Sequence, residues 1–313
     1  MPLDWSSPHA WRTAGRDRAW IDSIAGEPGT FWLGTHQPNW TWDGTMTGPT
    51  FVSATRLRKR VTPFPRARVP IAIDSGGFTE VTQRGGWTVP AIDYVALVRR
   101  ASIELGTVEW AAIQDWMVED VALRSTGLSI AEHQRRTVVS YLQLVSLAPE
   151  IRWLPVLQGQ TIADYLACWD LYDLAGVDLA GHQLVGLGSV CRRQATDEIV
   201  TIVRELAGRG LRMHGFGVKA TGLAAVGNLL RSADSLAWSF QGRRRSQPGR
   251  TPLFGEVSIN AGTRDSAGRS LANSPEHAEQ FRRQMVALIS RPGTGLGLVG
   301  AREQIGLDLE NSA

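Results

Sequence analysis

The chain has 313 residues, of which 43% are hydrophobic and 20% are charged, a balance typical of a globular protein and unlike that of a disordered or fibrous one. The formal net charge of +3 excludes a polycation, and two cysteines, Cys168 and Cys191, are too few for a disulfide framework or a four-cysteine zinc site. The first residues lack the apolar stretch of a secretory signal, and no segment approaches the ~20 apolar residues of a membrane span. We therefore expect a cytoplasmic protein with no membrane partner, in which both cysteines are small buried hydrophobes.

Short apolar runs alternate with longer amphipathic stretches along the chain. The runs predict strands at residues 31–34, 69–73, 108–113, 152–157, 183–188, 211–217 and 235–238, with a weaker eighth at 256–259. The stretches predict helices at residues 90–105, 130–147, 161–174, 195–209, 220–231 and 275–290. The interval between the first two strands is irregular and rich in Trp, Thr, Gly and Pro, and we expect an active-site or substrate loop there.

This alternation is typical of parallel βα units. Seven or eight units predict an α/β fold, a (β/α)8 TIM barrel that forms a single domain over residues 1–313. A doubly wound open sheet is the competing architecture. The segment 240–273, basic and then rich in Gly and Ser, is expected to form a mobile basic loop.

Polar residues follow the predicted strands at the ends where parallel α/β folds gather their chemistry. They are Asp74, Asp115, Gln158 and His214, while the apolar run QLV leads into the turn Gly186 and Leu187, and Asp234 directly precedes the strand predicted at 235–238. One aspartate before a glycine-rich turn usually caps the next helix. Three carboxylates at one end of a barrel indicate a catalytic site instead, because like charges raise each other's pKa values and so separate acid and base roles.

The order of these motifs resembles that of the queuine and archaeosine tRNA-guanine transglycosylases. The similar motifs are DSGGF at residues 74–78, a strand-end aspartate at 115, LQG at 157–159, a Gly-Leu turn at 186–187 and HGFGV at 214–218. The resemblance covers roughly residues 30–240. It implies a (β/α)8 barrel that exchanges a guanine in nucleic acid for a 7-deazaguanine, without a cofactor.

The resemblance also implies roles for single residues. Asp74, in the DSGG motif with Ser75 and Gly76, matches the general acid/base, and Asp115 matches the aspartate that binds the guanine-like edge of the base. Gln158 and the backbone at Gly186 and Leu187 match the groups around the base carbonyl, while His214 is expected to orient backbone or phosphate.

The segment around Asp234 departs from the family pattern. The transglycosylases carry their nucleophile in a segment like D-M-F-D-C, whereas here Ala237 stands in place of the second aspartate. Asp234 is therefore the candidate nucleophile by default. Because no cysteine follows Cys191, the zinc subdomain of the tRNA enzymes is missing and we expect no metal.

Without the zinc motif, and with GTHQP at 34–38 and GSVCRR at 188–193, the chain looks most like the DpdA group, which inserts 7-deazaguanines into DNA. The expected partners are then guanine-containing DNA and a free 7-deazaguanine such as 7-cyano-7-deazaguanine. Basic residues suit phosphate contacts. The candidates beside the proposed site are Arg192, Arg193, Lys219, Arg243, Arg244 and Arg245.

Three other functions fit the same residues. One is a tRNA-guanine transglycosylase without zinc, and another is a barrel glycosidase or nucleoside hydrolase in which water resolves the intermediate. The third is a catalytically inactive barrel that only binds nucleic acid, which the substitution at Ala237 keeps open.

Overall fold

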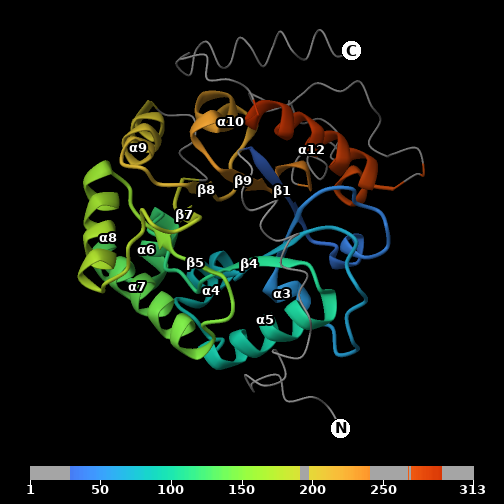
Figure 1. Cartoon of the computed structure of the whole chain (residues 1–313), viewed down its shortest axis with the longest axis horizontal. Coiled ribbons are helices and arrows are strands. Elements are labelled where there is room, and N and C mark those ends of the chain that lie inside the picture. The colour runs from blue at the N-terminus through green and yellow to red at the C-terminus, as the bar shows by residue number, and fades with distance from the viewer. Residues whose placement is uncertain (1–28, 191–196, 240–266, 268, 291–313) are drawn as a thin grey trace.

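The computed structural model describes residues 29–190, 197–239, 267 and 269–290, and its strands form a barrel ringed by helices (Figure 1). All strand pairs are parallel, in the order β5-β4-β3-β2-β1-β9-β8-β7-β6. The strands are β1 (Thr30–Thr35), β2 (Thr50–Ser53), β3 (Ile71–Asp74), β4 (Val108–Ala112), β5 (Trp153–Leu154), β6 (Val156–Leu157), β7 (Val185–Leu187), β8 (Met213–Gly215) and β9 (Ser232–Ser235).

Pro155 explains how nine strand segments make a barrel of eight. It stands alone between β5 and β6, and its ring has no N–H to give to a strand ladder. β5 pairs with β4 through Ala111 and Trp153, whereas β6 pairs with β7 through Val156 and Gly186. The two segments therefore act as one strand that joins both ends of the sheet, and the predicted (β/α)8 barrel is confirmed.

The helices lie outside the strands (Figure 1). They are α3 (Ala54–Leu57), α4 (Gly77–Arg84), α5 (Ala91–Leu105), α6 (Asp120–Thr126), α7 (Ile130–Leu147), α8 (Ile162–Leu174), α9 (Asp197–Gly208), α10 (Ala220–Val226) and α12 (Pro275–Ile289), with short 3-10 turns at Pro38–Thr41, Gly227–Leu229 and Leu271–Asn273. The larger helices begin where the sequence provides caps. The Ser129 and Ser274 side chains accept hydrogen bonds from the first turns of α7 and α12, and Thr161 and Asp164 form a capping box on α8.

The barrel wall separates two hydrophobic clusters. The larger one lies between the strands and the helices. The smaller one fills the barrel interior and contains Trp32, Phe51, Ala72, Trp110, Ala112 and Leu154. Alternate strand residues supply the two clusters, as the two-residue period of a strand requires. Aromatic rings thus pack the interior directly beneath the carboxyl ends of the strands.

Two strand predictions need correction. The interval between the first two predicted strands contains β2, so the eighth barrel strand is Thr50–Ser53, while the predicted strand at 256–259 lies outside the described residues. The last strand is Ser232–Ser235 rather than 235–238, and a helical turn begins at Ala237. The sequence 232–235 lacks an apolar run because Ser232 and Asp234 point into the polar end of the barrel.

Among the described residues, no helix combines the length and apolar character that crossing a membrane requires.

Candidate functional site

A pocket of about 540 Å³ lies at the carboxyl ends of the strands. Three carboxylates from different parts of the barrel line it: Asp74 ends β3, Asp234 lies in β9, and Asp115 follows β4. Gln158, directly after β6, and Lys219, before α10, line it as well. The structure therefore brings together the three aspartates that the sequence places far apart.

The Asp74 carboxylate is oriented by hydrogen bonds from the turn that follows it and from the neighbouring strand β2. It accepts hydrogen bonds from the Gly76 backbone and the Ser53 side chain, and Ser53 is its register partner in β2. Burial raises the pKa of Asp74 more than these bonds lower it, and the charge of Asp234 raises it further. Asp74 therefore holds a proton more tightly than an ordinary aspartate does.

Gly76 allows the turn that follows Asp74. Its φ is +84°, and a Cβ there would lie 2.6 Å from the Thr55 Oγ1 atom. Only glycine adopts this backbone at little cost and fits against the neighbouring helix. The DSGG sequence thus aims the Asp74 carboxylate by fixing the start of α4 at Gly77.

Asp115 belongs to a chain of buried hydrogen bonds. The Gln158 Nε2 atom donates to Asp115 Oδ2 at 2.6 Å, and the Ser189 hydroxyl donates to Gln158 Oε1 at 2.7 Å. The same hydroxyl accepts the Val118 N–H at 2.9 Å. The amide of Gln158 can therefore take one orientation, with its NH2 group toward Asp115.

The pKa of Asp115 is raised to about 7. Burial is the main cause and the charge of Asp74 adds to it, while the hydrogen bond from Gln158 acts in the opposite direction. The carboxyl group consequently changes its charge near neutral pH.

Asp234 is oriented from inside the barrel. Its Oδ1 atom accepts a hydrogen bond from the Gly217 N–H at 2.9 Å and lies 3.3 Å from the His214 Nε2 atom. The other ring nitrogen of His214 lies 2.8 Å from the Ser232 hydroxyl. Since an ionised carboxylate only accepts, His214 Nε2 carries the proton toward Asp234.

The polar face of α7 supports two of the loops that form the site. The backbone N–H of Trp116 donates to Thr137, and the His133 Nδ1 atom lies 2.7 Å from the Met117 carbonyl. The Gln134 amide donates to the backbone carbonyl of Gln158 at 2.7 Å. All three helix residues are buried. Polar residues on the core-facing side of an amphipathic helix need hydrogen-bond partners. The buried positions of His133, Gln134 and Thr137 in the helical pattern are therefore the sequence signal for these contacts.

Other residues expected at the site lie in different places. Gly186 and Leu187 are strand residues of β7, and the next two residues, Gly188 and Ser189, line the pocket instead. His214 is fully buried and contacts the pocket residues Asp234 and Phe216 from the barrel interior. In the DSGGF motif, Gly77 and Phe78 line the pocket, whereas Ser75 and Gly76 are not among its lining residues in the described part of the chain. The basic residues Arg192, Arg193, Arg243, Arg244 and Arg245, Cys191 and most of the segment 240–273 lie outside the described residues. Cys168 is buried, as expected, and burial raises its pKa to about 12.

The part of the chain that the structure describes contains no group of three His, Cys, Asp or Glu side chains placed to hold a metal ion.

The fold and the pocket together define a (β/α)8 barrel protein with a carboxylate-lined site at the carboxyl ends of its strands. The sequence matches the model of the DpdA family, described as DeoxyPurine in DNA protein A, over residues 28–263, more than half of the chain. The chain therefore belongs to the DpdA family, which confirms the resemblance drawn from DSGGF and the ordered motifs. The family's description ties it to the modification of deoxypurines in DNA. No curated protein matches the chain.

Proposed function

We propose that the protein exchanges guanine in DNA for a 7-deazaguanine, such as 7-cyano-7-deazaguanine, through a covalent aspartyl-glycosyl intermediate. The observation that carries the proposal is the convergence of Asp74, Asp115 and Asp234 on one pocket, in a chain whose family is tied to deoxypurines in DNA. A base inside a duplex is unreachable, so the target nucleotide must be extruded or already single-stranded.

Asp234 is the proposed nucleophile. Its carboxylate attacks C1′ of the deoxyribose as the bond from C1′ to the guanine breaks, and an ester bond between Asp234 and C1′ forms. The hydrogen bonds from Gly217 and His214 to Asp234 are made to Oδ1, and we assign the attack to Oδ2. In this scheme His214 acts as a positioning residue for Asp234.

Asp74 is the proposed general acid and base. Its raised pKa suits a group that gives a proton to the departing guanine and then takes one from the incoming 7-deazaguanine. The second attack, by the deprotonated ring nitrogen of the new base, breaks the ester and restores the carboxylate of Asp234. Two displacements retain the configuration at C1′.

Asp115 and Gln158 are proposed to recognise the base. The Asp115 carboxylate accepts hydrogen bonds from N1–H and the exocyclic amine of a guanine-like edge, whereas adenine offers no such pair of donors. Gln158 donates a hydrogen bond to the base carbonyl. Gly188 lies against the side-chain amide of Gln158, and both residues line the pocket.

The test is a base-exchange assay on guanine-containing DNA and, in parallel, on tRNA. Each polymer is incubated with 7-cyano-7-deazaguanine and analysed by nucleoside mass spectrometry. We expect incorporation into DNA that is lost in Asp74→Asn and Asp234→Asn and retained in Asp93→Asn, which changes an exposed carboxylate on α5 away from the pocket. Incorporation into tRNA alone, or release of guanine without incorporation, would contradict the proposal.

Trapping the intermediate tests the nucleophile separately. DNA incubated with enzyme but without the incoming base should yield a covalent complex that survives a denaturing gel. The complex should be absent in Asp234→Asn. A complex that persists in that variant would assign the attack to another residue.

A further inference from the structure

A second hollow of about 240 Å³ lies beside the base pocket, on the outer side of its wall. It is bounded by the loop between α4 and α5, the segment after β4 and the middle of α7, at residues 135–143. The residues that matter here are Trp87, Trp116, Arg135, Arg136 and Val139. Two indoles and two guanidinium groups around one hollow are a combination that favours nucleic acid.

Both indoles are fixed by hydrogen bonds or close packing. The Trp87 Nε1 atom donates to the Asp115 backbone carbonyl at 3.1 Å. The residue after Trp87 is tied to buried Glu80, which accepts the backbone N–H and the hydroxyl of Thr88. The Trp116 ring lies against Gly86, where an added Cβ would come within 3.1 Å of it. Rigid aromatic rings lose little conformational entropy when a base stacks on them.

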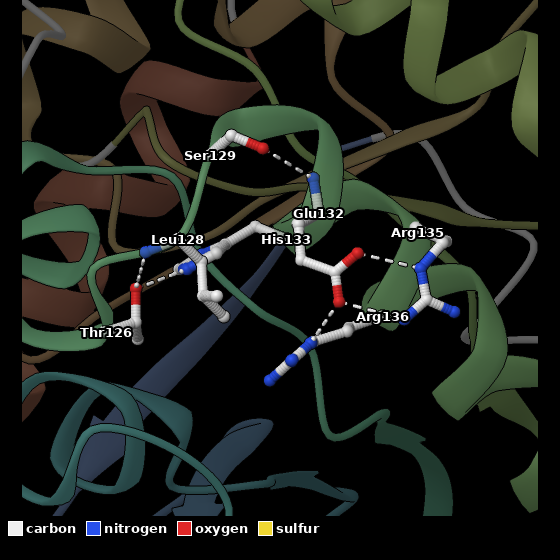
Figure 2. Close-up of polar contacts among 7 residues, drawn as sticks. All are labelled: Thr126, Leu128, Ser129, Glu132, His133, Arg135 and Arg136. Atoms are coloured by element: carbon white, nitrogen blue, oxygen red, sulfur yellow. Dashed lines mark hydrogen bonds and ion pairs between the residues drawn. The ribbon is translucent and has the colours of Figure 1, made fainter.

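The arginines are also held in place, as Figure 2 shows. Glu132 Oε1 and Oε2 accept hydrogen bonds from Arg135, and Oε1 also accepts one from Arg136. The hydrogen bonds from Arg135 and then Arg136 lower the pKa of Glu132 to about 2, so the cluster carries two positive charges and one negative charge near neutral pH. The Arg136 guanidinium stacks over the Trp116 ring at 4.6 Å, and the Arg135 side chain is 58% exposed. A net positive charge thus faces solvent at the rim of the hollow.

One thin wall separates the hollow from the base pocket. Asp115 lines the pocket and the next residue, Trp116, lines the hollow. On the other side of the wall, a Cβ added to the pocket residue Gly77 would meet the Trp87 ring at 3.2 Å. Because neighbouring nucleotides share a single phosphate, the nucleotide next to a guanine in the pocket stays close to the pocket, and the hollow begins one residue away, at Trp116.

We propose that the hollow binds the nucleotide next to the exchanged guanine on the same DNA strand. The neighbouring base stacks on the indole of Trp116, with Trp87 bordering the same hollow, and its phosphate contacts Arg135. The proposal rests on the proposed function in taking a DNA strand as the substrate. It adds a contact surface that lies on α7, outside the base pocket.

The first experiment measures the salt dependence of binding to a single-stranded oligonucleotide with one guanine. Losing one phosphate contact should weaken binding and reduce the slope of log Kd against log salt concentration by about 0.7, the value for one contact on a single strand. We expect this change in Arg135→Gln. The matched control is Arg209→Gln, since Arg209 is also an exposed arginine paired with a glutamate, Glu205, but lies in the turn that follows α9. It should keep the wild-type slope.

The second experiment removes the neighbouring base. An abasic site on one flank of the guanine should weaken binding by the wild type about tenfold, the value of one stacked base at ~1–3 kcal/mol. In Trp116→Leu the intact strand should bind as weakly as the abasic one, so that the abasic penalty disappears. The coupling between the two changes isolates the stacking contact, provided that the variant keeps the circular dichroism spectrum of the wild type.

The outcomes separate this proposal from the proposed function. The flanking site would be overturned, and the chemistry left standing, if the protein exchanges bases while two binding results are negative. These results are a wild-type salt slope in Arg135→Gln and no loss of binding from an abasic site on either flank. The opposite result is a protein that exchanges no base, but whose Arg135→Gln variant has a reduced salt slope and whose abasic penalty is removed by Trp116→Leu. It would support the flanking site and overturn the chemistry. Failure to bind any DNA strand would overturn both.

Discussion

The charge of Asp115 should control the affinity of the free base. Since its pKa is about 7, the carboxyl is mostly protonated below that pH in the empty pocket and accepts poorly from N1–H and the exocyclic amine of the base. The base must then expel a proton, so its affinity should fall about tenfold for each pH unit below 7 and level off above it. Titration of 7-cyano-7-deazaguanine by calorimetry between pH 5 and 8.5 measures this.

The matching variant for that titration is Asp115→Asn. An amide in place of the carboxyl cannot ionise, so the variant should bind weakly and with little dependence on pH. The comparison also removes any effect of the base's own titration. A wild-type affinity that stays constant over the range would sink the assignment of Asp115 to the base edge.

Ser189 should contribute to binding of the free base, although the family resemblance assigns it no role. Its hydroxyl fixes the Gln158 amide, and its φ of 59° is strained for a residue with a Cβ. Ser189→Ala should therefore raise KM for the free base about 2- to 10-fold, the equivalent of one lost hydrogen bond of ~0.5–1.5 kcal/mol. Steady-state kinetics with kcat and KM determined separately checks this.

Ser189→Gly separates orientation from backbone strain. Glycine also lacks the hydroxyl, but it adopts a positive φ at little cost. The two variants should share the raised KM, while the glycine variant has the higher Tm. If Ser189→Gly binds the base like the wild type, the hydroxyl does not orient Gln158.

At the scale of residues, the sequence reveals groups that sit in recognisable local motifs. Asp74 and Gln158 could be predicted because glycine-rich turns follow them at strand ends, and both line the pocket. Ser53 and Ser189 could not, because their roles arise from contacts with residues distant in the chain, Asp74 and Gln158. Ser189 lies in the GSVCRR motif, but neither that motif nor the sequence around Ser53 shows what these hydroxyls contact.

At the scale of elements, α7 carries part of the site from outside the barrel. In Thr137→Val the Trp116 N–H loses its acceptor inside the protein, and an unsatisfied buried donor costs about 1–3 kcal/mol. We expect a lower urea midpoint with an unchanged m value. Urea unfolding followed by circular dichroism measures it.

The control for Thr137→Val lies on another helix. Thr201 on α9 is exposed, and its hydroxyl bonds to the carbonyl of Asp197 in its own helix. Thr201→Val should change stability by no more than about 0.5 kcal/mol. Equal effects in the two variants would mean that the bond to Trp116 contributes nothing beyond the general cost of the substitution.

The elements themselves could be predicted where periodicity is strong. Helices α5, α7, α8 and α12 begin and end within a residue or so of their predicted bounds, because each has an amphipathic pattern and a proline or cap at its start. β2 was missed because it has only four residues inside an irregular interval. The predicted position of β9 is three residues too far along the chain. Its inward-facing residues are polar, so the apolar run lies in the residues that follow the strand.

At the scale of the whole molecule, the barrel depends on contacts between the two ends of the described chain. β1 pairs with β9, and α12 covers the outside of this seam, where Phe281 meets Phe31 edge-on at 6.2 Å and Met285 and Ile289 are buried. α12 lies beyond residue 263, where the family match ends. We propose that α12 is nonetheless part of the same folding unit, in keeping with a single domain over residues 1–313.

This proposal predicts how the molecule unfolds when α12 is weakened. Phe281→Ala should destabilise the protein by about 3–5 kcal/mol, the usual cost of removing a buried aromatic ring, and Arg283→Ala on the exposed side of the helix should have little effect. If the helix and barrel unfold together, thermal transitions followed by circular dichroism and by tryptophan fluorescence should shift equally and stay coincident. Trp32 and Trp110 in the barrel interior contribute to the fluorescence signal. An early loss of helical signal in Phe281→Ala, with the fluorescence transition unmoved, would instead make α12 a separate appendage on a barrel that is stable without it.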